Sequence, residues 1–131
     1  MFVDASAWTA ILLNEPERNA FRAKLDEAAT ILSSPIANWE TVRAVTRETR
    51  RDWAEVVPVV VALQAGFAVQ HVRIGEDEQI FALEAHARFG KGVHPAKLNM
   101  GDCFAYACAR TNGVPLLYKG DDFSLTDIER A

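Results

Sequence analysis

The chain alternates short apolar segments with longer amphipathic ones, and this alternation limits the folds that it can adopt. The short segments are rich in Val, Ile and Leu and stop at turn residues, as buried strands do. We expect strands over residues 1–4, 29–33, 69–74 and 114–118. Helical periodicity fills the intervals, over residues 8–13, from Pro16 onward, and over 36–50, 52–67, 76–89 and 99–111. Strands separated by helices build parallel sheets, so we predict an α/β fold, a central parallel β-sheet of four to five strands with helices on both faces.

The segment over residues 52–67 fits two interpretations. Its valine density favours a strand, whereas its length and its ending at Gln64-Ala65-Gly66 favour a helix. We predict a helix that is broken or starts near Pro58, because a proline removes one backbone hydrogen bond inside a helix.

Length and composition indicate one globular domain over residues 1–131, because no linker, repeat or low-complexity tract divides the chain. Hydrophobic residues make up 50% and charged residues 24%, which argues against disorder. The net charge of −4 excludes a uniformly basic nucleic-acid binder but leaves room for a local basic patch.

The sequence predicts a cytoplasmic protein without a membrane segment. Its longest apolar run, residues 56–63, is far shorter than the roughly 20 residues that span a bilayer. The N-terminus lacks the basic stretch of a signal peptide. Cys103 and Cys108 lie five residues apart in one predicted helix, too far for a disulfide and too few for a zinc site, as expected in a reducing compartment.

Acidic residues stand where several predicted strands end. Asp4 ends the first strand, Glu40 and Asp102 lie near the starts of two helices, and Asp121 and Asp122 follow the last strand. Chemistry in parallel α/β sheets gathers at the carboxyl ends of the strands, so we expect these acids at one rim. Converging carboxylates repel one another, which raises their pKa values or requires a cation, and hard oxygen ligands favour Mg²⁺ or Mn²⁺. The pattern therefore indicates metal-assisted phosphoryl transfer.

Each acid also has an ordinary structural interpretation. Asp4 could cap the helix that follows it, and Glu40 could form a surface ion pair with Arg43. Asp102 could form a capping box with Asn99, and the last two acids could belong to a solvated turn.

Four sequence strings, in this order, resemble the PIN-domain nucleases, and specifically the VapC toxins of prokaryotic toxin–antitoxin pairs. They are FVDASA (residues 2–7), NWETV (38–42), LNMGDCFAYA (98–107) and LLYKGDDF (116–123). The loop GKGVHPAKLN (90–99) resembles one recurrent VapC subgroup. The likeness extends over essentially the whole chain.

The resemblance implies a PIN-domain endoribonuclease that uses Mg²⁺ or Mn²⁺ and a metal-activated water. Asp4, Glu40, Asp102 and Asp122 match the four acids of the family. Asp4, Asp102 and Asp122 would hold the metal, partly through water, and Glu40 would orient or deprotonate the attacking water.

Three further residues are secondary candidates for the site. Ser6 matches a small polar position that holds the first acid or the scissile phosphate in the family. Asp121 could be an outer or alternative ligand, although Asp122, directly before Phe123, fits the family position better. Asp127 lies in a Thr-Asp string near the C-terminus.

An acidic nuclease must hold RNA through a local basic patch, for which the candidates are Lys97, Lys119, Arg43 and Arg47. The resemblance also implies a homodimer and a cognate VapB-type antitoxin that places a basic side chain among the carboxylates. Candidates for an apolar groove that receives an antitoxin helix are Trp8, Leu12, Phe21 and Trp53, although these residues could instead belong to the core or to a dimer interface.

Two other functions are compatible with the residues alone. One is a different Mg²⁺-dependent phosphoryl-transfer or phosphoacceptor domain, in which Lys119 would support an aspartate nucleophile. The other is a non-catalytic binding module whose acids only cap helices.

Overall fold

A four-stranded parallel sheet lies at the centre of the computed structural model, which describes residues 1–131. The strand order is β3-β2-β1-β4, and every neighbouring pair is parallel. The strands are β1 Phe2–Val3, β2 Leu32–Ser33, β3 Gln70–His71 and β4 Leu116–Leu117. The predicted parallel α/β fold is confirmed. Each strand is shorter than expected, because the residues that flank it pair too little with the neighbouring strands to extend the ladder of hydrogen bonds.

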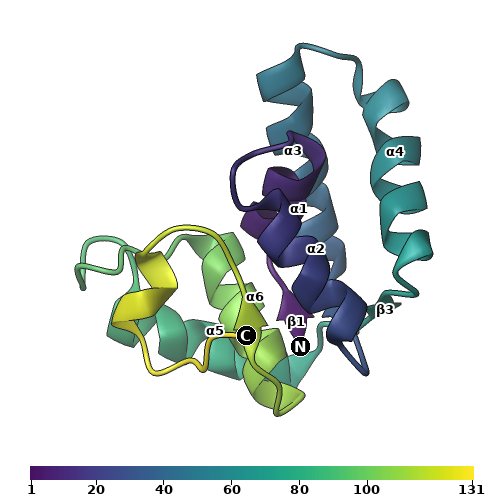
Figure 1. Cartoon of the computed structure of the whole chain (residues 1–131). Coiled ribbons are helices and arrows are strands. Elements are labelled where there is room, and N and C mark those ends of the chain that lie inside the picture. Colours follow the sequence, from purple (N-terminus) through teal and green to yellow (C-terminus); the bar gives the residue numbers. More distant parts are fainter.

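Six α-helices surround the sheet, together with a short 3₁₀ helix. They are α1 Ala5–Leu12, α2 Arg18–Glu27, α3 Pro35–Thr49, α4 Trp53–Gly66, α5 Glu76–Phe89, α6 Met100–Thr111 and η1 Asp122–Leu125. Figure 1 shows α5 and α6 on one side of β1 and α1 to α4 on the other. None of the helices is long and apolar enough to cross a membrane.

Successive residues of a strand point to opposite faces of the sheet, so they pack into two separate cores. Phe2 and Leu116 pack with α5 and α6, in a core that includes Tyr106. Val3 and Leu117 point the other way and pack with α1 and α2. The sheet is therefore covered by helices on both faces. This cover determines where the carboxyl ends of the strands reach solvent.

Helix α4 differs from the prediction at Pro58. The helix starts at Trp53, where the Asp52 side chain accepts a hydrogen bond from the Ala54 amide at 2.8 Å, and it continues through Pro58 without a break. It is attached mainly through Val56 and Val60, which pack on Val45 of α3. Helices α3 and α4 thus form a hairpin that projects from the sheet (Figure 1).

The first helix also starts earlier than expected. Residues 5–7, which precede the predicted helix over 8–13, form the first turn of α1, because Asp4 caps the helix directly after β1. The two cysteines are buried and free, as predicted.

The C-terminal segment is fastened to the rest of the fold through Asp127. Its two carboxylate oxygens accept hydrogen bonds from the Tyr106 hydroxyl at 2.7 Å and the Arg88 guanidinium at 2.8 Å. Burial and the bond to Asp127 raise the pKa of Tyr106 to about 12. Asp127 therefore joins the tail to α5 and α6.

We expect Asp127→Ala to destabilise the fold. Two hydrogen bonds would be lost. The bond to the exposed Arg88 contributes little to stability, whereas the bond from the partly buried Tyr106 hydroxyl contributes about 1 kcal/mol to the free energy of unfolding. Chemical denaturation measures this loss, and Asp26→Asn, a change at an exposed acid of α2, is the control. An unchanged free energy of unfolding in Asp127→Ala would contradict the role of these two hydrogen bonds in fastening the tail.

Candidate active site

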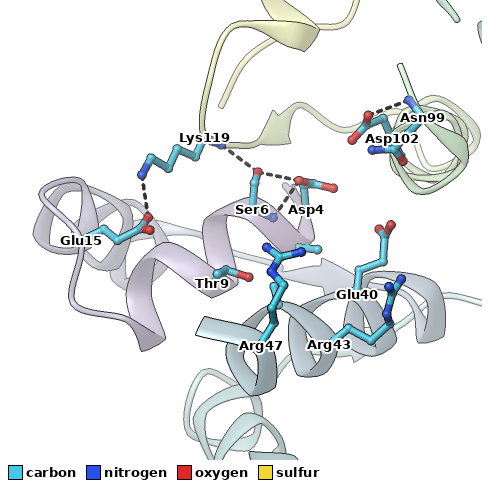
Figure 2. Close-up of a pocket in the computed structure, with 12 residues that line it drawn as sticks. Asp4, Ser6, Thr9, Glu15, Glu40, Arg43, Arg47, Asn99, Asp102 and Lys119 are labelled. Atoms are coloured by element: carbon cyan, nitrogen blue, oxygen red, sulfur yellow. Dashed lines mark hydrogen bonds and ion pairs between the residues drawn. The ribbon is translucent and has the colours of Figure 1, made fainter. Parts of the chain in front are cut away.

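Three of the predicted acids meet in one cleft at the carboxyl ends of the strands. Asp4, Glu40 and Asp102 line a cavity of about 340 Å³, together with Arg43 and Arg47. Figure 2 shows the three carboxylates directed into the same space from three different elements, the end of β1, α3 and the start of α6. The convergence that the sequence suggested is thus present for three of the four acids.

Asp4 is almost fully buried and is fixed by Ser6. The Asp4 Oδ2 atom accepts hydrogen bonds from the Ser6 amide at 2.9 Å and from the Ser6 hydroxyl at 2.5 Å. The Ser6 hydroxyl in turn accepts a hydrogen bond from the Lys119 amide at 2.9 Å. Ser6 therefore links the first acid to the chain that leaves β4, and the helix-cap interpretation of Asp4 is correct alongside its place in the cleft.

Asp102 is also both a helix cap and a cleft residue. Its Oδ2 atom accepts a hydrogen bond from the Asn99 amide at 2.8 Å, and its own amide donates to Asn99 Oδ1 at 3.1 Å. This capping box fixes the carboxylate at the start of α6, since it satisfies two free amides of the first turn.

Burial and mutual repulsion raise the pKa values of these acids and so disfavour their ionised forms. Burial raises the pKa of Asp4, and burial followed by the charge of Asp4 raises the pKa of Glu40. The pKa of Asp102 rises to about 7, mainly through burial, with added repulsion from Asp4, Glu40 and Asp122. A cation placed among these carboxylates would relieve that cost.

The donor set fits a hard divalent cation that keeps part of its water shell. No three of the Asp, Glu, His and Cys side chains of the chain stand close enough together to hold a metal ion alone. Mg²⁺ usually binds through one or two carboxylates and completes its octahedron with water and substrate phosphate oxygens. Asp4 and Asp102 can supply such a pair.

Asp121 and Asp122 lie at the start of η1, exposed to solvent and outside the lining of the cleft. Asp122 still raises the pKa of Asp102, so its charge reaches the site. The buried Phe123, which packs on Tyr118 with ring centroids 4.9 Å apart, anchors this segment. The role of Asp122 as the fourth acid stays a prediction.

The predicted basic residues divide into two groups. Arg43 and Arg47 line the cleft, and Arg43 also stacks on the Trp39 ring at 4.6 Å. Lys119 lines it too, but its ammonium group pairs with Glu15 at 2.7 Å and lies 3.6 Å from Glu17. Lys97 is exposed in the loop before α6 and does not line the cleft.

Sequence reasoning missed Thr9 and Glu15 as cleft residues. Thr9 could have been found, because it lies one helical turn after Ser6 on α1 and so shares its face. Glu15 could not, since its position depends on the turn between α1 and α2.

Of the two interpretations of the apolar groove candidates, burial in the core is correct for Trp8 and Phe21, which pack on the α1 and α2 side. Trp53 is 65% exposed and, with Trp39 and Val57, lines a groove of about 390 Å³ between α3 and α4. We call this the tryptophan groove, lined by Asn38, Trp39, Val42, Arg43, Trp53, Val57, Val60 and Val61.

Comparison with known proteins matches this arrangement to one family. The PIN domain family model matches residues 1–129. A VapC ribonuclease of Rhizobium meliloti is 38% identical over 139 residues, covering 97% of this chain and 98% of the relative. Ribonuclease VapC42 of Mycobacterium tuberculosis is 35% identical over 133 residues, covering 100% of this chain and 98% of the relative.

The fold has a solved counterpart. The crystal structure of Mycobacterium tuberculosis VapC20, described as a Sarcin-Ricin loop cleaving toxin, superposes with a TM-score of 0.77 at 18% identity, covering 99% of this chain and 97% of that one. With the full-length relatives, these matches show that the chain belongs to the PIN-domain family and, within it, to the VapC ribonucleases.

Proposed function

We propose that this VapC-family endoribonuclease is the toxin of a type II toxin–antitoxin pair and cleaves RNA in the Asp4–Glu40–Asp102 cleft with Mg²⁺ or Mn²⁺. The observation that carries the proposal is the convergence of three carboxylates from separate elements beside two arginines. A carboxylate cluster alone would repel a phosphate, so the neighbouring cations matter for the choice of an RNA substrate.

Each side chain has a role that follows from how it is held. Asp4 and Asp102 are fixed by cap hydrogen bonds and would hold the cation, with Asp122 approaching from η1. The bound cation would neutralise charge on the scissile phosphate and lower the pKa of a water. The carboxylate of Glu40, which has no hydrogen bond to the rest of the chain, would accept the proton of the attacking water.

The basic residues would hold the flanking phosphates of the strand. Arg43 and Arg47 line the cleft on the α3 side, where they are exposed and can meet a backbone that runs across it. Lys119 is engaged by Glu15, so it supports the site through its backbone amide to Ser6 rather than as a free cation. The same ion pair argues against a phosphoacceptor domain, which needs that ammonium group for the phosphate.

We expect Asp4→Asn and Asp102→Asn each to lower RNA cleavage by about 10²–10³-fold, the scale seen when one electrostatic contact to the transition state is removed. The amide oxygen can still accept the cap hydrogen bonds, and a buried repulsive charge is removed, so the thermal midpoint should stay or rise. Cleavage of total RNA with Mg²⁺ or Mn²⁺, and with EDTA, measures the loss. Asp26→Asn serves as the matched control, and full activity in both cleft variants would refute the site.

The raised pKa of Asp102, about 7, predicts that the metal-free protein loses stability as the pH rises. Because the folded state binds the proton more tightly than the unfolded state, this stabilisation is complete below the unfolded pKa and is lost as the pH rises through about 7. The thermal midpoint should therefore fall by roughly 3–8 °C more in the natural chain than in Asp102→Asn between about pH 5 and pH 8.

Mg²⁺ should reverse that loss, since it needs the ionised carboxylate. The Mg²⁺-induced rise in midpoint should be larger at the higher pH and should shrink in Asp102→Asn. A rise that is independent of pH, or equal in the two proteins, would separate Asp102 from cation binding.

The antitoxin would occupy the tryptophan groove and reach the cleft from there. Arg43 lines both cavities, so the groove lies next to the acidic cleft. One VapB-type segment could seat apolar side chains between Trp39 and Trp53 and place a basic side chain among the carboxylates, which would explain inhibition by charge complementarity.

We expect Trp53→Ala to weaken binding of the cognate antitoxin about tenfold or more, as for truncation of a central aromatic anchor. Titration calorimetry measures the affinity, and Val93→Ala, at another exposed apolar residue, is the control.

The family resemblance also predicts a homodimer, which light scattering of the purified chain tests. A change of oligomeric mass in Trp53→Ala without a change in antitoxin affinity would assign the groove to the second copy instead.

A further inference from the structure

We propose that Gly101 is a positioning residue for Glu40: its missing side chain leaves the space in which the Glu40 carboxylate lies against the start of α6, next to Asp102. This inference rests on the proposed role of Glu40 in cleavage. It concerns a residue that touches neither substrate nor cation and acts only through a neighbouring side chain.

Position 101 holds a glycine because of its neighbours and not because of its backbone conformation. Gly101 is the second residue of α6 and is buried. It is absent from the glycines with positive φ, so the backbone does not require it. A Cβ atom built there would overlap the carboxyl carbon and both oxygens of Glu40, and these three atoms are its nearest neighbours.

Other glycines of the chain show that this relation is specific. A Cβ atom at Gly90 would meet the backbone oxygen of His86, which cannot move without the helix. At Gly66, the last residue of α4, a Cβ atom would meet nothing within 4 Å. Only at Gly101 is the opposing group a carboxylate of the active site.

Glu40 depends on this space because little else holds it. The carboxylates of Asp4 and Asp102 are each fixed by hydrogen bonds, whereas the carboxylate of Glu40 takes part in no hydrogen bond or ion pair with the chain. Its backbone is well placed, since Ser34 caps α3 and Thr41 bonds back to the Ala37 carbonyl at 2.7 Å. The carboxylate itself is confined by contact with Gly101 and by the charge of Arg43.

A methyl group at position 101 would therefore disturb the carboxylate and little else. The overlapping atoms are the far end of a flexible side chain, so Glu40 can swing aside without moving α3 or α6. Alanine is also a better helix residue than glycine, which favours the folded state. Displacing a reactive group by about 1 Å can cost 10²-fold in rate, so activity and stability should respond in opposite directions.

The experiment compares Gly101→Ala with the natural chain and with Gly66→Ala, the matched helical control in open space. Cleavage of total RNA with Mn²⁺ should fall at least about tenfold in Gly101→Ala, with the loss in kcat rather than KM. Its thermal midpoint should be unchanged or higher. Gly66→Ala should keep full activity.

Rescue by a shorter acid separates positioning from general damage. Glu40→Asp retracts the carboxylate by one methylene group, so the double variant Gly101→Ala/Glu40→Asp should cleave RNA at least as fast as Glu40→Asp alone. Cleavage by Gly101→Ala within about twofold of the natural chain, or loss of activity together with a lowered midpoint, would overturn the proposal.

A stability cycle tests the contact even if the chain cleaves no RNA. Gly101→Ala should raise the thermal midpoint more in a Glu40→Ala background than in the natural chain, because the overlap is then absent. Equal shifts in the two backgrounds would show that Glu40 does not occupy this space. Failure of RNA cleavage in the natural chain, with the stability coupling present, would sink the proposed substrate but leave the contact established.

Discussion

The candidate cleft depends on holding the carboxylate of Asp4 out of water. Asp4 is only 3% exposed, and an ionised carboxylate in such a place is costly unless it receives hydrogen bonds. Ser6 supplies two of them and is itself bonded to the Lys119 amide. The acid at the end of β1 is thereby tied to the chain that leaves β4, and the depth of the cleft is set where the two central strands end.

Much of the architecture could be predicted because it follows from local patterns. Strand–helix alternation predicted the parallel sheet, and the capping box of Asn99 and Asp102 marked where α6 begins. The continuous helix through Pro58 was not predictable from propensity, since packing of Val56 and Val60 on α3 compensates for the lost backbone bond. Local sequence thus determined which helices and strands form, whereas packing between α3 and α4 keeps α4 continuous through Pro58.

The site was predictable only in part, for reasons of placement. Three acids converge because strand ends share a rim, but the position of Asp122 depends on how η1 folds beyond β4. The burial of Trp8 could not be read from α1 alone, because it depends on α2 folding back over that face. The contact between Gly101 and Glu40 needs the relative placement of α3 and α6, which no local pattern contains.

Helix capping and a place in the cleft are compatible interpretations of the acids, because a carboxylate has two oxygens. In Asp4 and in Asp102 the hydrogen bonds to the chain use Oδ2, so the cap fixes the group and leaves Oδ1 for another partner. Such rigid acids suit the binding of a cation. Glu40 caps nothing; contact with Gly101 and the charge of Arg43, rather than a hydrogen bond, hold its carboxylate in the cleft.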